Sequence, residues 1–302
     1  MSLDLILPFL RPIAQAIEDP EVSEIMVNGS RGVFIERAGL LERLEGVMLE
    51  ERQIQVAAKH IARLVGDDVS EERPILDARL PDGSRVAAVL PPASVGGTTL
   101  TIRRFHRRYR TCDDLVAAGM LTTEAVGVIR DALLNRRNVL ISGGTGTGKT
   151  TLLNACLGLV PETDRIILIE DTAELAPAHP NLVRFEARRH QLGAEAVTVR
   201  DLLKAALRHR PDRIVVGEVR GGEAFDLLQA LNTGHGGSLS TIHANSADHA
   251  RARLGICALM GGVDVPHGVV RALLEATINV VVHLERRRGV RVVGEIRRCG
   301  GA

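Results

Sequence analysis

Short apolar runs separated by turn residues fill roughly the first hundred positions of the chain. The turns are rich in Gly, Asn and Asp, and one contains Asp82-Gly83, a strong signal for a tight hairpin. Residues 51–65 instead place apolar side chains at helical spacing. The expected elements are a hairpin, a helix, a second hairpin and a further strand: residues 24–36, 51–65, 75–90 and 98–105. This pattern predicts a small α+β domain over residues 1–106.

The start of the chain has apolar positions at helical spacing, interrupted near Pro8. These positions are Leu3, Leu5, Ile6, Phe9, Leu10, Ile13 and Ile17. An amphipathic helix of this kind favours packing against the fold or a neighbouring subunit, and contact with a membrane surface is the alternative. The stretch has no basic residues before its apolar part, so we expect no signal peptide.

The rest of the chain alternates between short, continuous apolar strands and helical segments. Residues 106–113 are polar and Arg-rich without periodicity, so residues 107–120 are expected to be a linker. We expect one helical stretch over residues 115–134, and a hairpin at the end of the chain. Continuous apolar strands between helices are typical of a parallel sheet covered on both faces. Residues 121–302 are therefore expected to form an α/β domain.

Composition narrows the possible partners. Among 302 residues, 38 are basic and 37 acidic, which gives a net charge of +1 and no global field to attract nucleic acid. Aromatic residues make up only 2%, fewer than expected of a protein that stacks on single strands. The four cysteines form no CxxC pair, so free thiols in a reducing cytosol are the simplest interpretation.

The strongest local signal is a glycine-rich loop between a predicted strand and a predicted helix. It matches G-x-x-x-x-G-K-[ST], the phosphate-binding loop. Its residues are Gly143, Gly144, Thr145, Gly146, Thr147, Gly148, Lys149, Thr150 and Thr151. Glycines let backbone N–H groups turn toward phosphate oxygens, Lys149 adds a positive charge, and Thr150 offers a hydroxyl to Mg²⁺. Lys149 is also one of only three lysines in an Arg-rich chain, and it lies where the motif requires a lysine. The motif and its strand–loop–helix context predict binding of a nucleoside triphosphate such as ATP.

Two acidic residues end apolar strands of the same predicted sheet, Glu170 and Glu218. Ligands of open α/β sheets bind at the carboxyl ends of the strands, where both acids fall. A carboxylate there can accept a proton from a water molecule or hold a metal-bound water, although such an acid can also cap the next helix. Sequence spacing does not decide which of the two is the base. Thr150 and Glu218 are the candidate Mg²⁺ ligands, in part through water.

Histidine and arginine supply further candidates. His243 follows a short strand, where it can contact a γ-phosphate or pack as a core residue. Phosphoryl transfer commonly needs an arginine to neutralise charge. The candidates in the first domain are Arg79, Arg85, Arg103 and Arg104, and any of them can also be a solvated surface charge. Because consecutive strand residues point to opposite faces, one of Arg103 and Arg104 can face a neighbouring phosphate while the other pairs elsewhere.

Taken in order, these motifs resemble the ATPases of type II/IV secretion and pilus-assembly systems. The resemblance covers nearly the whole chain and is nearest to the tight-adherence (CpaF-like) and conjugal-transfer (TrbB-like) branches. The matching stretches are residues 19–29, 77–85, 101–105, 142–151, 169–175, 210–223 and 233–246. Secretion and pilus-extension members of the family carry a tetracysteine zinc insert that this sequence lacks. Some tight-adherence members carry a long N-terminal extension that this sequence also lacks. These two departures leave open which apparatus the ATPase serves.

The resemblance implies a RecA-like nucleotide domain and a homohexameric ring that hydrolyses Mg²⁺-ATP between its two domains. It implies work on inner-membrane platform proteins from the cytoplasmic face, with at most peripheral membrane association and no direct nucleic-acid binding. By the same resemblance Glu170 is the general base, Glu218 the Walker B acid and His243 the nucleotide-state contact. The arginines of the first domain approach the phosphates.

Two alternatives use the same residues. A RecA-like nucleic-acid translocase or helicase shares the nucleotide core, and many-fold stimulation of ATP turnover by DNA would distinguish it. A nucleotide-gated scaffold would bind ATP without releasing phosphate. The presence of both Glu170 and Glu218 argues against the scaffold.

Overall fold

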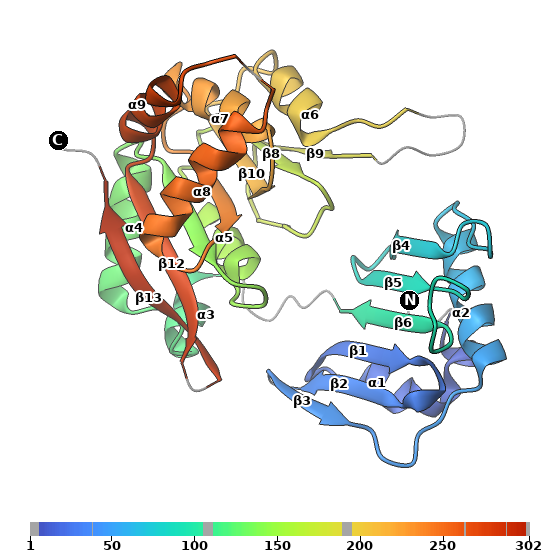
Figure 1. Cartoon of the computed structure of the whole chain (residues 1–302). Helices are drawn as coiled ribbons and strands as arrows, with labels where there is room; N and C mark the ends of the chain where they lie inside the picture. Colours follow the sequence, from blue (N-terminus) through green and yellow to red (C-terminus); the bar gives the residue numbers. More distant parts are fainter. Residues whose placement is uncertain are drawn as a thin grey trace. The chain divides into compact units, whose positions relative to one another are not determined.

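A computed structural model describes residues 6–37, 39–104, 111–188, 195–262, 264–287 and 289–299. The chain divides into two compact units, Met1–Arg107 and Arg108–Ala302, and each is described below by itself (Figure 1).

The N-terminal unit is a six-stranded antiparallel sheet in the order β3-β2-β1-β6-β5-β4. The strands are β1 (Val22–Asn28), β2 (Val33–Arg37), β3 (Leu40–Arg43), β4 (Ile75–Arg79), β5 (Arg85–Val89) and β6 (Thr99–Arg103). Helices α1 (Ala14–Glu18) and α2 (Glu51–Leu64) contribute buried residues to a core on one face of this sheet. Both predicted hairpins, the helix and the further strand are confirmed, whereas β3 was not predicted. Its leucines, Leu40 and Leu41, are exposed, so its sequence lacks the alternation of buried and exposed positions that indicates a strand.

The apolar positions at the start of the chain pack inside this unit. Ile6, Leu10, Ile13 and Ile17 are at most 2% exposed and belong to its core. The prediction of packing against the fold is confirmed for these residues, and residues 1–5 lie outside the described part. The segment is broken into the short 3₁₀ turns η2 (Leu7–Phe9) and η3 (Arg11–Ile13) before α1, because a proline lies at the start of each turn.

The C-terminal unit is a seven-stranded sheet in the order β13-β12-β7-β11-β10-β8-β9. Its strands are β7 (Val139–Gly143), β8 (Ile166–Glu170), β9 (Leu182–Glu186), β10 (Arg213–Val219), β11 (Leu239–His243), β12 (Val280–Arg287) and β13 (Val290–Arg298). Every pairing is parallel except the terminal hairpin of β12 and β13. The carboxyl ends of β7, β8, β10 and β11 therefore meet at one edge.

Helices cover both faces of this sheet (Figure 1). One core includes α3 (Cys112–Ala117), α4 (Thr123–Leu134) and α5 (Lys149–Leu157). The other includes α6 (Val199–Ala206), α7 (Glu223–Asn232), α8 (Ala247–Leu259) and α9 (His267–Thr277). Successive side chains of β7 pack alternately into the two cores, with Ile141 in the first and Leu140 in the second. The predicted α/β class and its parallel sheet are confirmed.

Two details differ from the expected elements. The single helix expected over residues 115–134 is two helices, because Gly119 has φ +71° and Thr122 caps a new helix by accepting a hydrogen bond from the Ala125 amide at 3.2 Å. Of the predicted linker, residues 107–110 lie outside the described part, and α3 contacts α5. Among the described residues, no helix combines the length and apolar character needed to cross a bilayer.

Candidate active site

The glycine-rich loop joins the end of β7 to the start of α5, in the predicted strand–loop–helix context. Gly146 and Gly148 have φ of +68° and +95°, which glycine adopts without strain. A Cβ added to Gly143 would lie 2.6 Å from the carbonyl oxygen of Leu284 on β12, closer than real contacts allow. The loop backbone can therefore curve tightly only because these side chains are missing.

Lys149 is buried beneath this loop, only 8% exposed. Its ammonium donates hydrogen bonds to the carbonyl oxygens of Gly143 at 3.0 Å and Gly144 at 2.9 Å. Its Nζ also lies 3.3 Å from Nε2 of His243. These contacts hold a positive charge at the point where the loop and the end of β11 meet.

Glu218 and His243 are joined at the ends of the adjacent strands β10 and β11. Oε1 of Glu218 lies 2.9 Å from Nε2 of His243, and Oε2 accepts a hydrogen bond from Arg220 at 2.7 Å. Burial acts to raise the pKa of Glu218, but Arg220, His243 and Lys149 outweigh it and leave the pKa below its ordinary value. Burial and the nearby charge of Lys149 lower the pKa of His243, against an opposing effect of Glu218. Glu218 is thus held as an anion beside a neutral imidazole.

Glu170 has a different environment at the end of β8. Its side chain is 4% exposed, and Oε1 accepts hydrogen bonds from the amides of Glu174 and Leu175, each at 2.8 Å. Oε2 lies 3.6 Å from the guanidinium of Arg184 on β9. Burial raises the pKa of Glu170, although the two backbone amides and Arg184 oppose the rise. Gly217 makes room for this carboxylate, since a Cβ there would lie 3.0 Å from Cγ of Glu170.

Three of the four predicted arginines form one row across the N-terminal sheet. Arg79 pairs with Arg85, Arg85 with Arg103, and Arg103 with Glu24, so these side chains share one face. Arg103 forms a 3.6 Å ion pair with Glu24. Arg104 lies apart from this row, because its guanidinium donates to the backbone carbonyls of Asp19 and Val22. The expected separation of Arg103 from Arg104 is therefore present.

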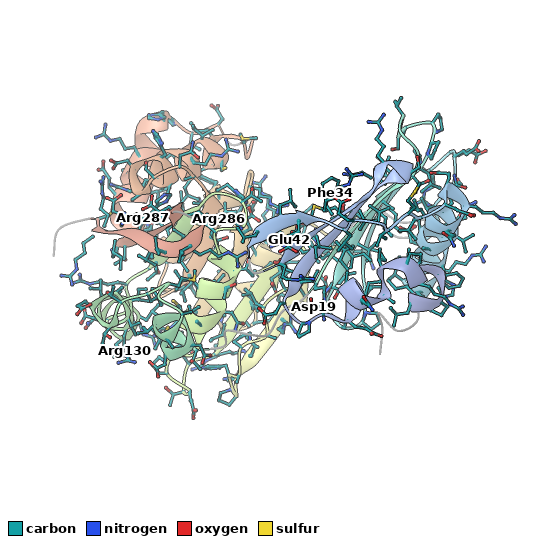
Figure 2. The ribbon with its side chains drawn as sticks, turned by 90° about the horizontal axis from the view of Figure 1, so that it is seen from below. Asp19, Phe34, Glu42, Arg130, Arg286 and Arg287 are labelled. Atoms are coloured by element: carbon teal, nitrogen blue, oxygen red, sulfur yellow. The ribbon has the colours of Figure 1, made fainter. Side chains whose placement is uncertain are left out.

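Several side chains at this edge were not among the predicted site residues. Arg184 reaches Glu170 from β9, and Arg220 bridges Glu218 to Asp171, its Nη1 lying 3.6 Å from the aspartate. Arg286 extends from the end of β12 and donates to the carbonyl oxygen of Gly146 at 3.3 Å (Figure 2). Nothing in the local sequence separates Arg184 and Arg286 from the many surface arginines, whereas Arg220 is a sequence candidate because it follows Glu218. Their partners depend on the order of the strands.

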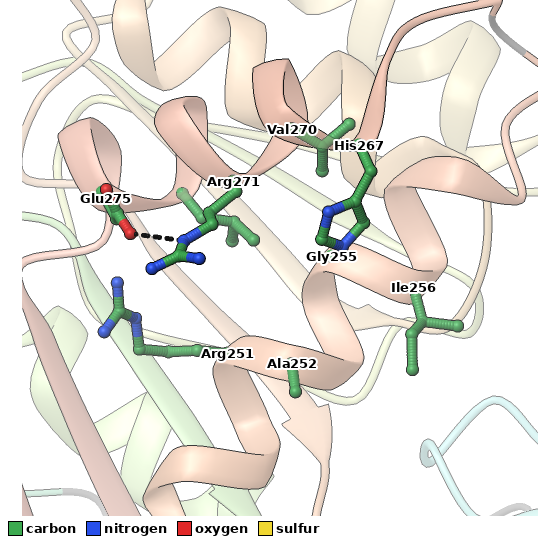
Figure 3. A pocket seen from close by; sticks show the side chains of 9 residues that line it. Arg251, Ala252, Gly255, Ile256, His267, Val270, Arg271 and Glu275 are labelled. Atoms are coloured by element: carbon green, nitrogen blue, oxygen red, sulfur yellow. Dashed lines mark hydrogen bonds and ion pairs between the residues drawn. The ribbon is translucent and has the colours of Figure 1, made fainter.

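A surface pocket of about 460 Å³ lies between α8 and α9 (Figure 3). Its lining includes Arg251, Ile256, His267 and Leu274, and Arg271 donates to Glu275 at 2.9 Å along helix α9. None of the predicted site residues lines it. The candidate chemistry is therefore concentrated at the strand ends and not in this pocket.

Comparison with known proteins identifies the family that carries this site. A sequence profile described as "Type II/IV secretion system protein" matches residues 10–291. The chain belongs to this family. It is 39% identical over 282 residues to a putative conjugal transfer protein of Mycobacterium tuberculosis, covering 91% of this chain and 80% of the relative. It is 37% identical over 285 residues to the conjugal transfer protein TrbB of Rhizobium radiobacter, covering 93% and 84%.

A solved structure supports the same assignment. The VirB11 ATPase of the Brucella suis type IV secretion system is 30% identical with a TM-score of 0.52, over 98% of this chain and 94% of that one. The resemblance inferred from the motifs is confirmed. Family membership makes the chain an ATPase of the type II/IV secretion class, and these comparisons do not favour a nucleic-acid translocase.

Proposed function

We propose that this chain forms a homohexamer that hydrolyses Mg²⁺-ATP to drive secretion or pilus assembly. It acts with platform proteins at the cytoplasmic face of the inner membrane. The observation that carries the proposal is one cluster: Lys149 beneath the glycine cradle, in contact with His243, which contacts Glu218 in turn. Family membership supports the coupling to an apparatus.

The loop has the shape and charge that a triphosphate requires. Its glycines let the backbone curve, with Gly146 and Gly148 at positive φ, and the amino end of α5 adds the positive end of a helix dipole. Thr150 in the first turn of α5 and the anionic Glu218 would hold Mg²⁺, in part through water. Bound there, the ion would neutralise charge on the phosphate oxygens.

The two carboxylates are suited to different roles. Glu170 has a raised pKa and presents Oε2, so it is proposed to accept a proton from the attacking water. Glu218 has a lowered pKa and stays charged, which suits a metal-binding acid. His243 contacts both Lys149 and Glu218, so it is proposed to respond to whether Lys149 is bound to phosphate.

The N-terminal unit is proposed to supply the remaining positive charge. Arg79, Arg85 and Arg103 share one row and form the preferred set for approaching the phosphates. Arg104 is retained as a weaker candidate, because its guanidinium already bonds to two backbone carbonyls.

The proposal is tested by ATP turnover, nucleotide affinity and oligomer mass of three variants. We expect Lys149→Ala to lose nucleotide binding, and Glu218→Gln to keep binding while turnover falls by about 10²-fold or more. Lys204→Ala is the matched control, because that lysine lies 3.9 Å from Asp226 on the helical layer and outside the site. A monomer whose turnover survives both site changes contradicts the proposal. Many-fold stimulation by DNA would favour a translocase.

A further inference from the structure

The edge strand β9 places a cation beside Glu170. In the parallel pairing of β8 with β9, Arg184 lies opposite Leu168, two residues before Glu170 is reached. Residues two apart on a strand share a face, so Arg184 can extend along the sheet to the carboxylate. Its Nη2 lies 3.6 Å from Oε2, while the guanidinium remains 40% exposed.

The other oxygen of Glu170 is fully used. Oε1 accepts the amides of Glu174 and Leu175, which fixes that oxygen in the loop after β8. Oε2 is buried and accepts no hydrogen bond within the described residues. The carboxylate therefore has one anchored oxygen and one oxygen facing Arg184.

The charged groups around Glu170 come from three directions. Arg184 and Glu186 lie on β9, and Oε1 of Glu186 accepts the Ala173 amide at 3.0 Å. Glu174 in the loop after β8 adds a like charge. Strand β10 presents Gly217, the residue before Glu218, against Cγ of Glu170. Arg220 pairs with Asp171, the residue after Glu170, and with Glu218. Arg184 is the cation that contacts Glu170 itself.

We propose that Arg184 is a positioning residue for Glu170, which holds Oε2 in one orientation as an anion ready to accept a proton. This inference rests on the role of Glu170 in the proposed function. A contact of 3.6 Å favours the charged carboxylate without the close bidentate pairing that would occupy the lone pairs of Oε2. Burial raises the pKa of Glu170 and the partly exposed cation opposes that rise, so the two effects together set how readily Oε2 accepts a proton.

The test compares Arg184→Gln with Arg184→Lys. We expect Arg184→Gln to lower kcat about tenfold with KM for ATP changed less than about twofold, because a group acting on the base affects the chemical step. The acid limb of its pH–rate profile moves to higher pH, because loss of the cation raises the pKa of Glu170 and favours the neutral carboxyl. Arg184→Lys restores most of kcat. Arg271→Gln removes another surface ion pair, with Glu275, and leaves the profile unchanged.

Two further measurements separate this inference from the proposed function. The first places Arg184→Gln in a Glu170→Gln background, where it has no additional effect if Arg184 acts through Glu170. The second follows the Glu170 carboxyl by infrared difference spectroscopy against pH, which needs no activity. An unmoved carboxyl titration, or equal effects in both backgrounds, overturns the role of Arg184. A shifted titration with an unmoved acid limb supports the Arg184–Glu170 pair and instead contradicts Glu170 as the base.

Discussion

At the scale of single residues, the site depends on glycines, whose missing side chains allow close packing, as well as on its charged residues. Atoms of Leu284 and Thr147 lie too close to Gly143 for a Cβ to fit there. Glu170 lies similarly close to the Cβ position of Gly217. The glycine-rich motif therefore does more than permit curvature. Gly143 also lets β12 approach the loop closely, and Gly217, outside the motif, lets β10 approach Glu170.

Replacing Gly143 with Ala tests this close approach. We expect Gly143→Ala to lower the free energy of unfolding by about 1–3 kcal/mol, because the new methyl group meets a backbone oxygen that cannot rotate away. Nucleotide affinity should fall with it. The control is Gly127→Ala in the exposed part of α4, which should raise the free energy of unfolding by about 0.5–1 kcal/mol. Urea unfolding measures both, and an unchanged midpoint for Gly143→Ala would show that the loop has room to adjust.

The sequence identified residues that belong to a motif and missed those that depend on strand order. Lys149, Glu170, Glu218 and His243 could be predicted because each ends a strand or follows the glycine loop. Arg184 could not, since its role arises only when β9 pairs beside β8. The same holds for Arg286, which resembles the many exposed arginines of the chain. Arg220 could be named as a candidate because it follows Glu218, but its bridge to Asp171 depends on the order of the strands.

At the scale of elements, strands buried on both faces were the most predictable. Strands β7 and β8 are wholly buried and stand out as apolar runs. Strand β9 lies at the sheet edge with no buried residue, so its pattern is weak. Helix α8 buries Ala247, Ala250 and other small residues among its contacts, which gives little periodic contrast.

The first residue of helix α2, Glu51, is bonded through its carboxylate to Thr98, the residue before β6, which predicts a pH dependence of stability. Glu51 accepts the Thr98 amide at 2.9 Å and the Thr98 hydroxyl at 2.5 Å. Burial acts to raise its pKa, but the bonds from Thr98 and Gln55 prevail and lower it. A lowered pKa in the folded state means that the stabilisation is complete above the unfolded-state pKa of about 4.3 and is lost as pH falls through the folded-state value.

The corresponding variant is Glu51→Gln. We expect it to lower the free energy of unfolding by about 1–3 kcal/mol at neutral pH, because an amide cannot accept both bonds from Thr98 equally well. The difference from the wild type should shrink below about pH 4, where the wild-type carboxyl also becomes protonated. Glu45→Gln, on an exposed glutamate, serves as the control. A difference that stays constant down to pH 3 would show that the charge of Glu51 contributes nothing.

At the scale of the whole molecule, the two units contribute different groups to the proposed reaction. The C-terminal unit holds the phosphate loop, both acids and His243. The N-terminal unit holds the arginine row, whose members were expected from sequence but whose alignment on one face follows from the antiparallel register. We therefore expect turnover in the proposed hexamer to require the arginine row, and nucleotide binding to depend mainly on the loop.

Comparing the arginine row with Arg104 tests whether the row acts in turnover. We expect Arg79→Ala, Arg85→Ala and Arg103→Ala together to lower ATP turnover by about 10³-fold or more, because arginine stabilises charge that develops in the transition state. Affinity for a fluorescent ATP analogue should change by less than about threefold, since ground-state binding rests on the glycine loop. Arg104→Ala is the matched change on the neighbouring residue. It removes hydrogen bonds to the Asp19 and Val22 carbonyls, so it should lower thermal stability while turnover per folded molecule is retained. If turnover instead collapses with Arg104→Ala and survives the triple change, Arg104 is the residue that reaches the phosphates.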